Sequence, residues 1–278
     1  MNRIKRALLG AETRRFNAEL AELMPEELTS AARQCVMHEG TGPLEDRHRD
    51  RFPNGPFLTV NEADTLDFAI ELKRRSGKTP AVLNMACAYT PGSGWRSGAL
   101  SQEETLFYRS TYDLSMSDPL GLNPERTWRY PIPPTGAIYS PGVLVYRSSL
   151  NEGCQRLKRK HQETLSFVAV AAVRNPALNA DGQMTERDVA LTCEKIRTVL
   201  RVSALHGHDT VVLGALGCGA YHNPPEQVAQ SFCAVFGEPE FRGVFEHLAF
   251  AILDGPDTSN RRTFERVLLA APSHSAAK

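Results

Sequence analysis

Short apolar runs alternate with amphipathic segments along most of this 278-residue chain. Strand-length apolar runs predict buried β-strands at Phe57–Val60, Ala81–Ala86, Leu165–Val173, Thr210–Leu216 and His247–Leu253. Apolar residues at helical spacing predict helices between them, at Glu62–Arg75, between Thr185 and Gly207, from about Pro225, and at Asn260–Ala270. Continuous apolar strands alternating with such helices are typical of a largely parallel or mixed sheet with helices on both faces. We therefore expect an α/β fold.

Local signals refine these elements. Thr185 is a plausible N-cap of the longest helix, and Gly207 is a plausible stop, because glycine readily adopts the left-handed conformation that ends helices. The segment Gly136–Arg147 is expected to form two short strands that are broken at Pro141–Gly142.

The first 55 residues have a different pattern. Two helices are predicted, at Arg6–Leu23 and Pro25–Val36, followed by the polar stretch "HEGTGPLEDRHRDRFPNGP". We expect an N-terminal helical extension over residues 1–55, one large α/β domain over residues 56–272, and a disordered tail at residues 273–278.

Composition excludes several classes of protein. Lys and Arg together equal Asp and Glu, 32 of each, so there is no basic excess for binding duplex nucleic acid. The longest apolar runs are far shorter than a membrane span. The six cysteines form no CxxC pair and no secretory signal pattern is present, which favours reduced thiols in the cytoplasm. No cluster at metal-ligand spacing is evident, so we expect no metal or cofactor. We also expect a monomeric protein.

Glycine-rich loops follow two of the predicted strands. Ligands bind at the carboxyl ends of strands in open α/β sheets. In "GALGCGAYHNPPEQ", Gly217 and Gly219 permit close approach to the backbone, Asn223 can cap, and the helix start can hold an anion. A tight turn without a ligand is an equally good explanation of this loop by itself.

The other loop, "MACAYTPGSGWRSGALSQEE", ends in two adjacent glutamates. Ser101 can cap a helix there with Glu104 at the capping-box position. This explains one glutamate, but it does not explain Glu103 or Gln102. Two acids beside an anion site suggest acid–base catalysis on a sugar.

The segment "PGSGWRSGALSQEE" resembles the signature of the microbial-type poly(ADP-ribose) glycohydrolases, a branch of the macrodomain fold. That signature is a triple-glycine loop followed after six to eight residues by Gln-Glu-Glu. Seven residues, Trp95 to Ser101, separate the two parts here. Further blocks match in the family's order, namely "AVLNMACAYTPGSGW", "GAIYSPGVLVYR", "VVLGALGCGAYHNPPEQVA" and "FAILDG". The resemblance implies a macrodomain-like α/β/α sandwich with a mixed central sheet and a pocket for ADP-ribose.

The resemblance also implies roles for individual residues. Glu104 corresponds to the catalytic acid and base, and Glu103 to the neighbour that holds the ribose hydroxyls. Asn84 and Cys87 correspond to residues that contact this ribose, and Tyr221 to an aromatic that packs against it. The remaining expected ligand contacts are Gly92, Ser93, Gly94, Gln102, Gly217, Cys218, Gly219 and Ala220.

Some alternatives stay open. Ser93 replaces the central glycine of the motif, and Trp95 belongs either to the core or to the mouth of the pocket. The substrate is either poly(ADP-ribose) or a protein carrying single ADP-ribose groups. A non-catalytic ADP-ribose reader is the main rival function, although a reader has no need for two acids. Cys218 is a conceivable nucleophile, but a packed loop residue is the simpler interpretation.

Overall fold

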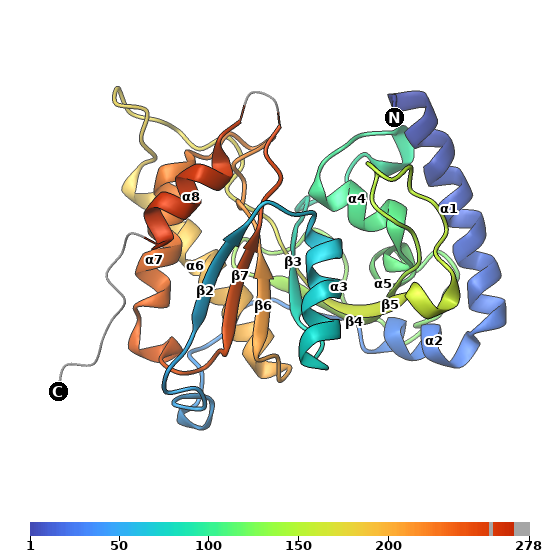
Figure 1. Cartoon of the computed structure of the whole chain (residues 1–278), viewed down its shortest axis with the longest axis horizontal. Coiled ribbons are helices and arrows are strands. Elements are labelled where there is room, and N and C mark those ends of the chain that lie inside the picture. The colour runs from blue at the N-terminus through green and yellow to red at the C-terminus, as the bar shows by residue number, and fades with distance from the viewer. Residues whose placement is uncertain (256–257, 270–278) are drawn as a thin grey trace.

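A mixed sheet forms the centre of the computed structural model, which describes residues 1–255 and 258–269 (Figure 1). In these residues the sheet has seven strands in the order β1-β4-β5-β3-β6-β7-β2. The strands are β1 (Val36–His38), β2 (Phe57–Asn61), β3 (Ala81–Met85), β4 (Ala137–Val145), β5 (Glu163–Val170), β6 (Thr210–Leu213) and β7 (His247–Ala251). Strands β5, β3, β6, β7 and β2 are parallel, whereas β4 and β1 are antiparallel to their neighbours.

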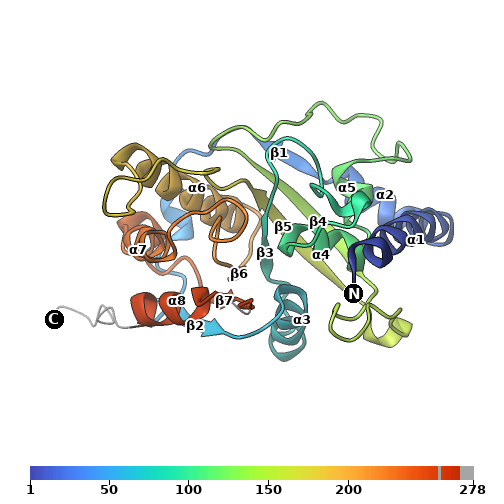
Figure 2. The same cartoon turned by 90° about the horizontal axis from the view of Figure 1, so that it is seen from above.

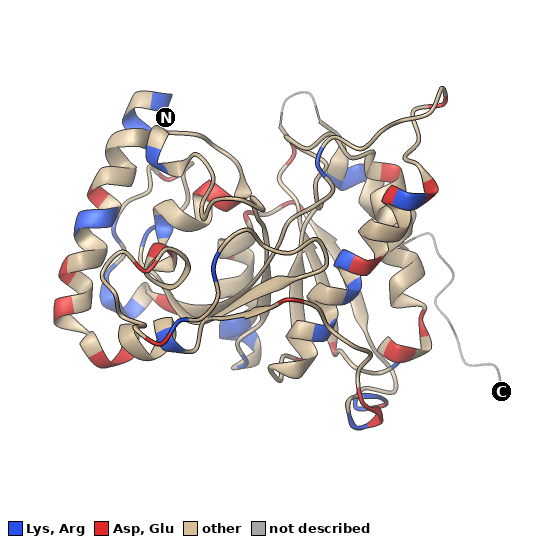
Figure 3. Cartoon of the chain, turned by 180° about the vertical axis from the view of Figure 1, so that it is seen from behind, with Lys and Arg blue, Asp and Glu red and all other residues tan. Residues whose placement is uncertain are grey.

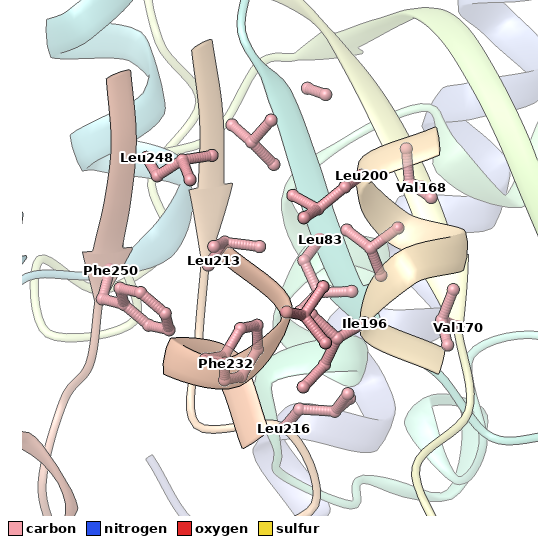
Figure 4. Close-up of a cluster of buried hydrophobic side chains, with 14 of the residues drawn as sticks. Leu83, Val168, Val170, Ile196, Leu200, Leu213, Leu216, Phe232, Leu248 and Phe250 are labelled. Atoms are coloured by element: carbon pink, nitrogen blue, oxygen red, sulfur yellow. The ribbon is translucent and has the colours of Figure 1, made fainter. Parts of the chain in front are cut away.

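Helices cover both faces of the sheet. One face carries α6 (Glu186–Leu205), α7 (Pro225–Phe236) and α8 (Asn260–Leu269), and the other carries α3 (Thr65–Ser76), α4 (Gln102–Arg109) and α5 (Tyr112–Met116) (Figure 2). Side chains alternate between the faces along each strand. Leu83 of β3 therefore packs with Ile196 of α6 and Phe232 of α7 (Figure 4), whereas Val82 packs on the opposite side. This arrangement confirms the predicted α/β/α sandwich.

The predicted signals for the longest helix and the broken strand are confirmed with one change. The Thr185 side chain accepts from the N–H of Asp188 at the start of α6, and Gly207 has a φ of 77° just after its end. The segment around Pro141–Gly142 is one strand, β4, and not two. Its register against β5 shifts between Ser140 and Val143, so the predicted break is a bulge.

The N-terminal segment contains α1 (Arg3–Leu23) and α2 (Pro25–Arg33), close to the two predicted helices. The predicted second helix, Pro25–Val36, was too long, because Val36–His38 is strand β1, which pairs with β4 at the sheet edge. A three-residue strand is too short to show a period in the sequence. The boundary at residue 55 stays a prediction, and the predicted tail lies outside the described residues.

Helix α1 packs against the first glycine loop. A Cβ on Gly98, which has a φ of 81°, would lie 2.1 Å from the carbonyl oxygen of Arg3. Arg3 and Arg6 donate side-chain hydrogen bonds to the carbonyls of Ser97 and Gly98. Helix α1 therefore supports the loop from outside.

Among the described residues, none of the helices combines the length and apolar character that a membrane span requires.

Candidate active site

Two glycine loops meet at the carboxyl edge of the parallel strands. The first, residues 86–101, follows β3, and the second, residues 214–224, follows β6, the neighbour of β3. The side chain of Tyr221 in the second loop lies close enough to the Cys87 thiol of the first for each to shift the pKa of the other. Ligands bind at this edge in open α/β sheets, so the structure brings both loops into one candidate site.

Gln102 ties the start of α4 to the end of β3. Its Nε2 donates to the carbonyl of Leu83 at 2.8 Å, and its Oε1 accepts from the N–H of Met85 at 3.1 Å. Both polar atoms of the side chain are used by the strand, and this contact fixes where the next two residues lie. A contact between Gln102 and a ligand stays a prediction.

Glu103 is buried beneath the first loop, with 2% of its surface exposed. Its Oε2 accepts from the N–H of Cys87 at 2.8 Å, and its Oε1 accepts from the N–H of Gly92 at 3.2 Å and from Asn84 Nδ2 at 3.5 Å. Burial is the largest influence on this carboxyl and raises its pKa to about 8, although the hydrogen bond from Cys87 opposes the rise. Much of Glu103 therefore carries a proton at neutral pH.

Glu104 is also buried, with 4% of its surface exposed, and it faces the same loop. Its Oε1 accepts from the N–H of Gly94 at 3.2 Å, and the Ser101 hydroxyl donates to its Oε2. Ser101 is the N-cap of α4, but its side chain bonds to this carboxylate and not to a backbone N–H of the helix. The carboxylate of Glu104 thus points to the glycine loop at the strand edge.

The first loop binds the protein's own carboxylates. The N–H groups of Gly92 and Gly94 donate to Glu103 and Glu104, so they are not free for an anionic ligand. Gly92 has a φ of 71°, and a Cβ there would lie 2.4 Å from Trp95 Cδ1. Ser93, at the position of the missing glycine, is exposed and has a φ of 48°, a conformation that favours glycine. Ligand contacts by these three loop residues stay predictions.

Trp95 belongs to the core. It is fully buried, and its ring lies 5.5 Å from the ring centroid of Phe107 and 6.1 Å from that of Tyr108. The alternative placement at the mouth of the pocket is therefore wrong. Helix α1 packs closely against it, since a Cβ on Gly10 would lie 3.1 Å from the Trp95 carbonyl oxygen.

The second loop is held by Asn223, but not as a helix cap. Its Nδ2 donates to the carbonyls of Val173, Gly217 and Tyr221 at 2.7, 3.1 and 3.2 Å. The N-cap of α7 is Pro224, followed by Pro225, so the predicted cap was wrong. Because proline has no N–H, the start of α7 offers fewer donors to an anion than the sequence suggested.

The donors that remain lie within the loop itself. The backbone N–H groups of Gly219, Ala220 and Tyr221 have no hydrogen-bond acceptor within residues 1–255 and 258–269. A Cβ on Gly219 would meet nothing within 4 Å, so protein packing does not require a glycine there. Consecutive unpaired N–H groups form a concavity suited to anions.

The two loop cysteines differ in their chemistry. Burial raises the pKa of the Cys218 thiol to about 12, which keeps it protonated and argues against a nucleophile. Burial also raises the pKa of Cys87, but hydrogen bonds from the Tyr89 backbone, from Thr90 and from Tyr221 outweigh burial and leave it lowered. Cys87 thus lies in the polar part of the site.

The comparisons with known proteins agree with this geometry. Residues 12–148 match the family model described as "Microbial-type PARG, catalytic domain", where PARG is poly(ADP-ribose) glycohydrolase. Over these residues the chain is similar to the microbial-type PARG family. The predicted family is therefore confirmed, and with it the class of glycosidic-bond hydrolases.

Solved bacterial PARGs are similar over most of the chain. The enzyme from Thermomonospora curvata is 28% identical with a TM-score of 0.75, covering 95% of this chain and 100% of that chain. Its form bound to the inhibitor ADP-HPD is 27% identical with a TM-score of 0.74, covering 95% and 99%. The Deinococcus radiodurans enzyme in complex with ADP-ribose is 26% identical with a TM-score of 0.69, covering 87% and 97%. A search of curated proteins finds no match.

Sequence reasoning missed two tyrosines near Glu103. The Tyr112 hydroxyl accepts from Asn84 Nδ2 at 3.3 Å, and the buried Tyr130 hydroxyl has no partner in the described part of the chain. Asn84 is fully buried, and its Oδ1 likewise lacks a partner there. Burial raises the pKa of Tyr130, and the charge of Glu103 adds to the rise. The segment around Tyr130 has no helical or strand period that could have indicated its place.

Proposed function

We propose that this protein hydrolyses the glycosidic bond of an ADP-ribose unit and releases ADP-ribose from poly(ADP-ribose) or from mono-ADP-ribosylated side chains. The observation that carries the proposal is the Glu104 carboxylate. It is buried, it faces the glycine loop beside a second buried glutamate, and it lies at the ligand-binding edge of the sheet. The match of residues 12–148 to the PARG catalytic-domain model supports the same reaction.

The proposed mechanism assigns the proton transfers to Glu104. Cleavage of a ribosyl bond passes through an oxocarbenium-like state, so an acid must protonate the departing oxygen. The resulting carboxylate then removes a proton from the attacking water. The N–H of Gly94 and the Ser101 hydroxyl hold the two oxygens of Glu104 and fix the carboxylate in one orientation.

Glu103 would hold the hydroxyls of the ribose. Because burial raises its pKa to about 8, it is largely protonated at pH 7 and can donate a hydrogen bond to a ribose oxygen. A neutral Glu103 also removes one negative charge from a site that must accept a diphosphate. We propose that Asn84 and Cys87 line the same ribose and that Tyr221 packs against it.

The second loop would bind the diphosphate. Its unpaired N–H groups at Gly219, Ala220 and Tyr221 support this assignment, together with the open space at Gly219. Gly217 contributes to the shape of the loop, since its φ is 77° and a Cβ there would lie 2.5 Å from Asn223 Nδ2. We also propose a cytoplasmic location, because the six cysteines are free thiols.

The test measures turnover and binding separately. The purified protein is incubated with poly(ADP-ribose) and with proteins singly modified on Glu, Ser or Arg, and free ADP-ribose is quantified. Glu104→Gln is expected to lower turnover by about 10²- to 10⁴-fold, the usual effect of losing a general acid or base. ADP-ribose binding, measured by calorimetry, should change little.

The control is Glu22→Gln, an exposed position on α1, which should keep both activities. A wild-type protein that binds ADP-ribose but releases none from every substrate would be a reader and not a hydrolase. Full activity in Glu104→Gln would remove Glu104 from the mechanism.

A further inference from the structure

A diphosphate bound in the candidate site would need a positively charged side chain nearby. A diphosphate is a dianion, and it would lie close to Glu103 and Glu104. Basic and acidic residues are interspersed over the elements visible in Figure 3. The positive charge that balances the diphosphate must therefore come from individual side chains beside the site. Of the basic side chains near the first loop, Arg96 is paired with Asp113, and Arg6 donates to the Gly98 carbonyl.

Arg174 lies beside the second loop. It follows β5, whose carboxyl end is at the same edge as the ends of β3 and β6. Its guanidinium carbon is 5.9 Å from the ring centroid of Tyr221, and the N–H of the next residue, Asn175, donates to the Tyr221 carbonyl at 3.0 Å. The side chain is exposed, and within residues 1–255 and 258–269 it has no acidic partner.

The position of Tyr221 connects Arg174 to the centre of the site. The side chain of Tyr221 lies close enough to the Cys87 thiol to influence its pKa, and the N–H of Cys87 donates to Glu103. Arg174 therefore lies at the outer end of a chain of contacts that crosses between the two loops. Its guanidinium lies over the ring of Tyr221, which is one of the three residues of the second loop with an unpaired N–H group.

We propose that Arg174 is a binding residue for the diphosphate of ADP-ribose, and this rests on the proposed function. An arginine fits this task because its planar group donates paired hydrogen bonds to phosphate oxygens and stays charged at all physiological pH values. The ring of Tyr221 would hold the guanidinium in place while the loop amides bind the other phosphate oxygens.

The experiment measures the ADP-ribose dissociation constant by calorimetry at low salt and at about 0.5 M salt, where charge interactions are strongly screened. Arg174→Gln is expected to raise the constant by about 10- to 100-fold at low salt, the effect of losing a charge-assisted hydrogen bond. Its affinity should depend less on salt than that of the wild type. Arg174→Lys, which keeps the charge, should recover part of the affinity and the wild-type salt dependence.

The matched control is Arg159→Gln. Arg159 is an exposed arginine just before β5, so it lies at the opposite end of the same strand and away from both loops. It should bind ADP-ribose like the wild type. Thermal unfolding of each variant reports whether the protein as a whole remains folded.

The outcomes separate this inference from the proposed function. Wild-type binding together with unchanged affinity and salt dependence in Arg174→Gln would overturn the role of Arg174 and leave the hydrolase intact. Equal loss in the Gln and Lys variants, independent of salt, would also overturn it, because Arg174 would then only support Tyr221. A wild-type protein that neither binds nor hydrolyses would overturn both proposals.

Discussion

Replacement of Glu103 by glutamine should remove a pH dependence of folding that this residue creates. The carboxyl group of Glu103 is buried, and its pKa is about 8 in the folded chain against an ordinary value of 4.5. Between these two values the folded chain holds a proton that the unfolded chain has released. Stability must therefore fall as pH rises through this window, because the unfolded state binds fewer protons there.

The size of the effect follows from the two pKa values. Each pKa unit corresponds to about 1.4 kcal/mol, so the full difference is worth about 5 kcal/mol. The contribution is fully present below pH 4.5 and is lost as pH passes 8. Between pH 5 and pH 8.5, the free energy of unfolding of the wild type should fall by about 4 kcal/mol relative to Glu103→Gln.

Glutamine has a cost of its own, but this cost does not depend on pH. Its amide has one acceptor oxygen, so Cys87 and Gly92 can no longer both donate to separate oxygens of the side chain. The –NH₂ group then faces an N–H, which destabilises the variant by about 1–3 kcal/mol at every pH. Only the change in the difference between wild type and variant across pH tests the reasoning.

Urea unfolding of both proteins at a series of pH values from 5 to 9 supplies that difference, with the slope against urea checked for constancy. Subtraction removes the contributions of other titrating groups, such as His206, whose pKa burial lowers to about 4. Glu22→Gln, at an exposed position, is the control and should track the wild type. A difference between wild type and Glu103→Gln that stays constant from pH 5 to pH 9 would refute the burial argument.

Two further substitutions test the loops. Ser93→Gly should stabilise the protein by about 1 kcal/mol, since a residue with a φ of 48° is better served by glycine, and the melting temperature should rise by about 2–4 °C. A lower melting temperature would show that the Ser93 side chain itself contributes to stability. Asn223→Ala should destabilise the protein by about 3 kcal/mol, because the carbonyls of Val173, Gly217 and Tyr221 lose their shared donor. Its ADP-ribose affinity should fall as well, and unchanged affinity by calorimetry would separate this network from the binding site.

The sequence predicted most of the sheet because its central strands are buried on both faces. β3 and β5 are continuous apolar runs, a pattern that is typical of parallel strands buried on both faces. β1 was missed because it is three residues long and obtains its place from pairing with β4, a contact between residues about a hundred positions apart. Such an edge strand has no local signal, so the sequence suggested the end of a helix there.

The candidate site was predicted unevenly for a similar reason. The spacing of the glycine loop and the glutamate pair is a local pattern, and it led to Glu103 and Glu104. The partners of these carboxylates depend on how the loop turns back over α4, which no pattern in the sequence specifies. Tyr130 comes from a segment with no regular period, and only the folded chain brings it to the site. Arg174 directly follows a predicted strand, but its contact with Tyr221 depends on how the second loop folds.

The hydrogen bonds of the first loop explain why a site of this kind has two glycine loops. The N–H groups of Cys87, Gly92 and Gly94 are occupied by Glu103 and Glu104, because buried carboxylates need donors. Those donors are then unavailable to a phosphate. A diphosphate in the same crevice therefore requires a second set of donors that approaches from the other side. The unpaired amides of residues 219–221 meet this requirement. These amides are neutral, and in our proposal Arg174 supplies the positive charge.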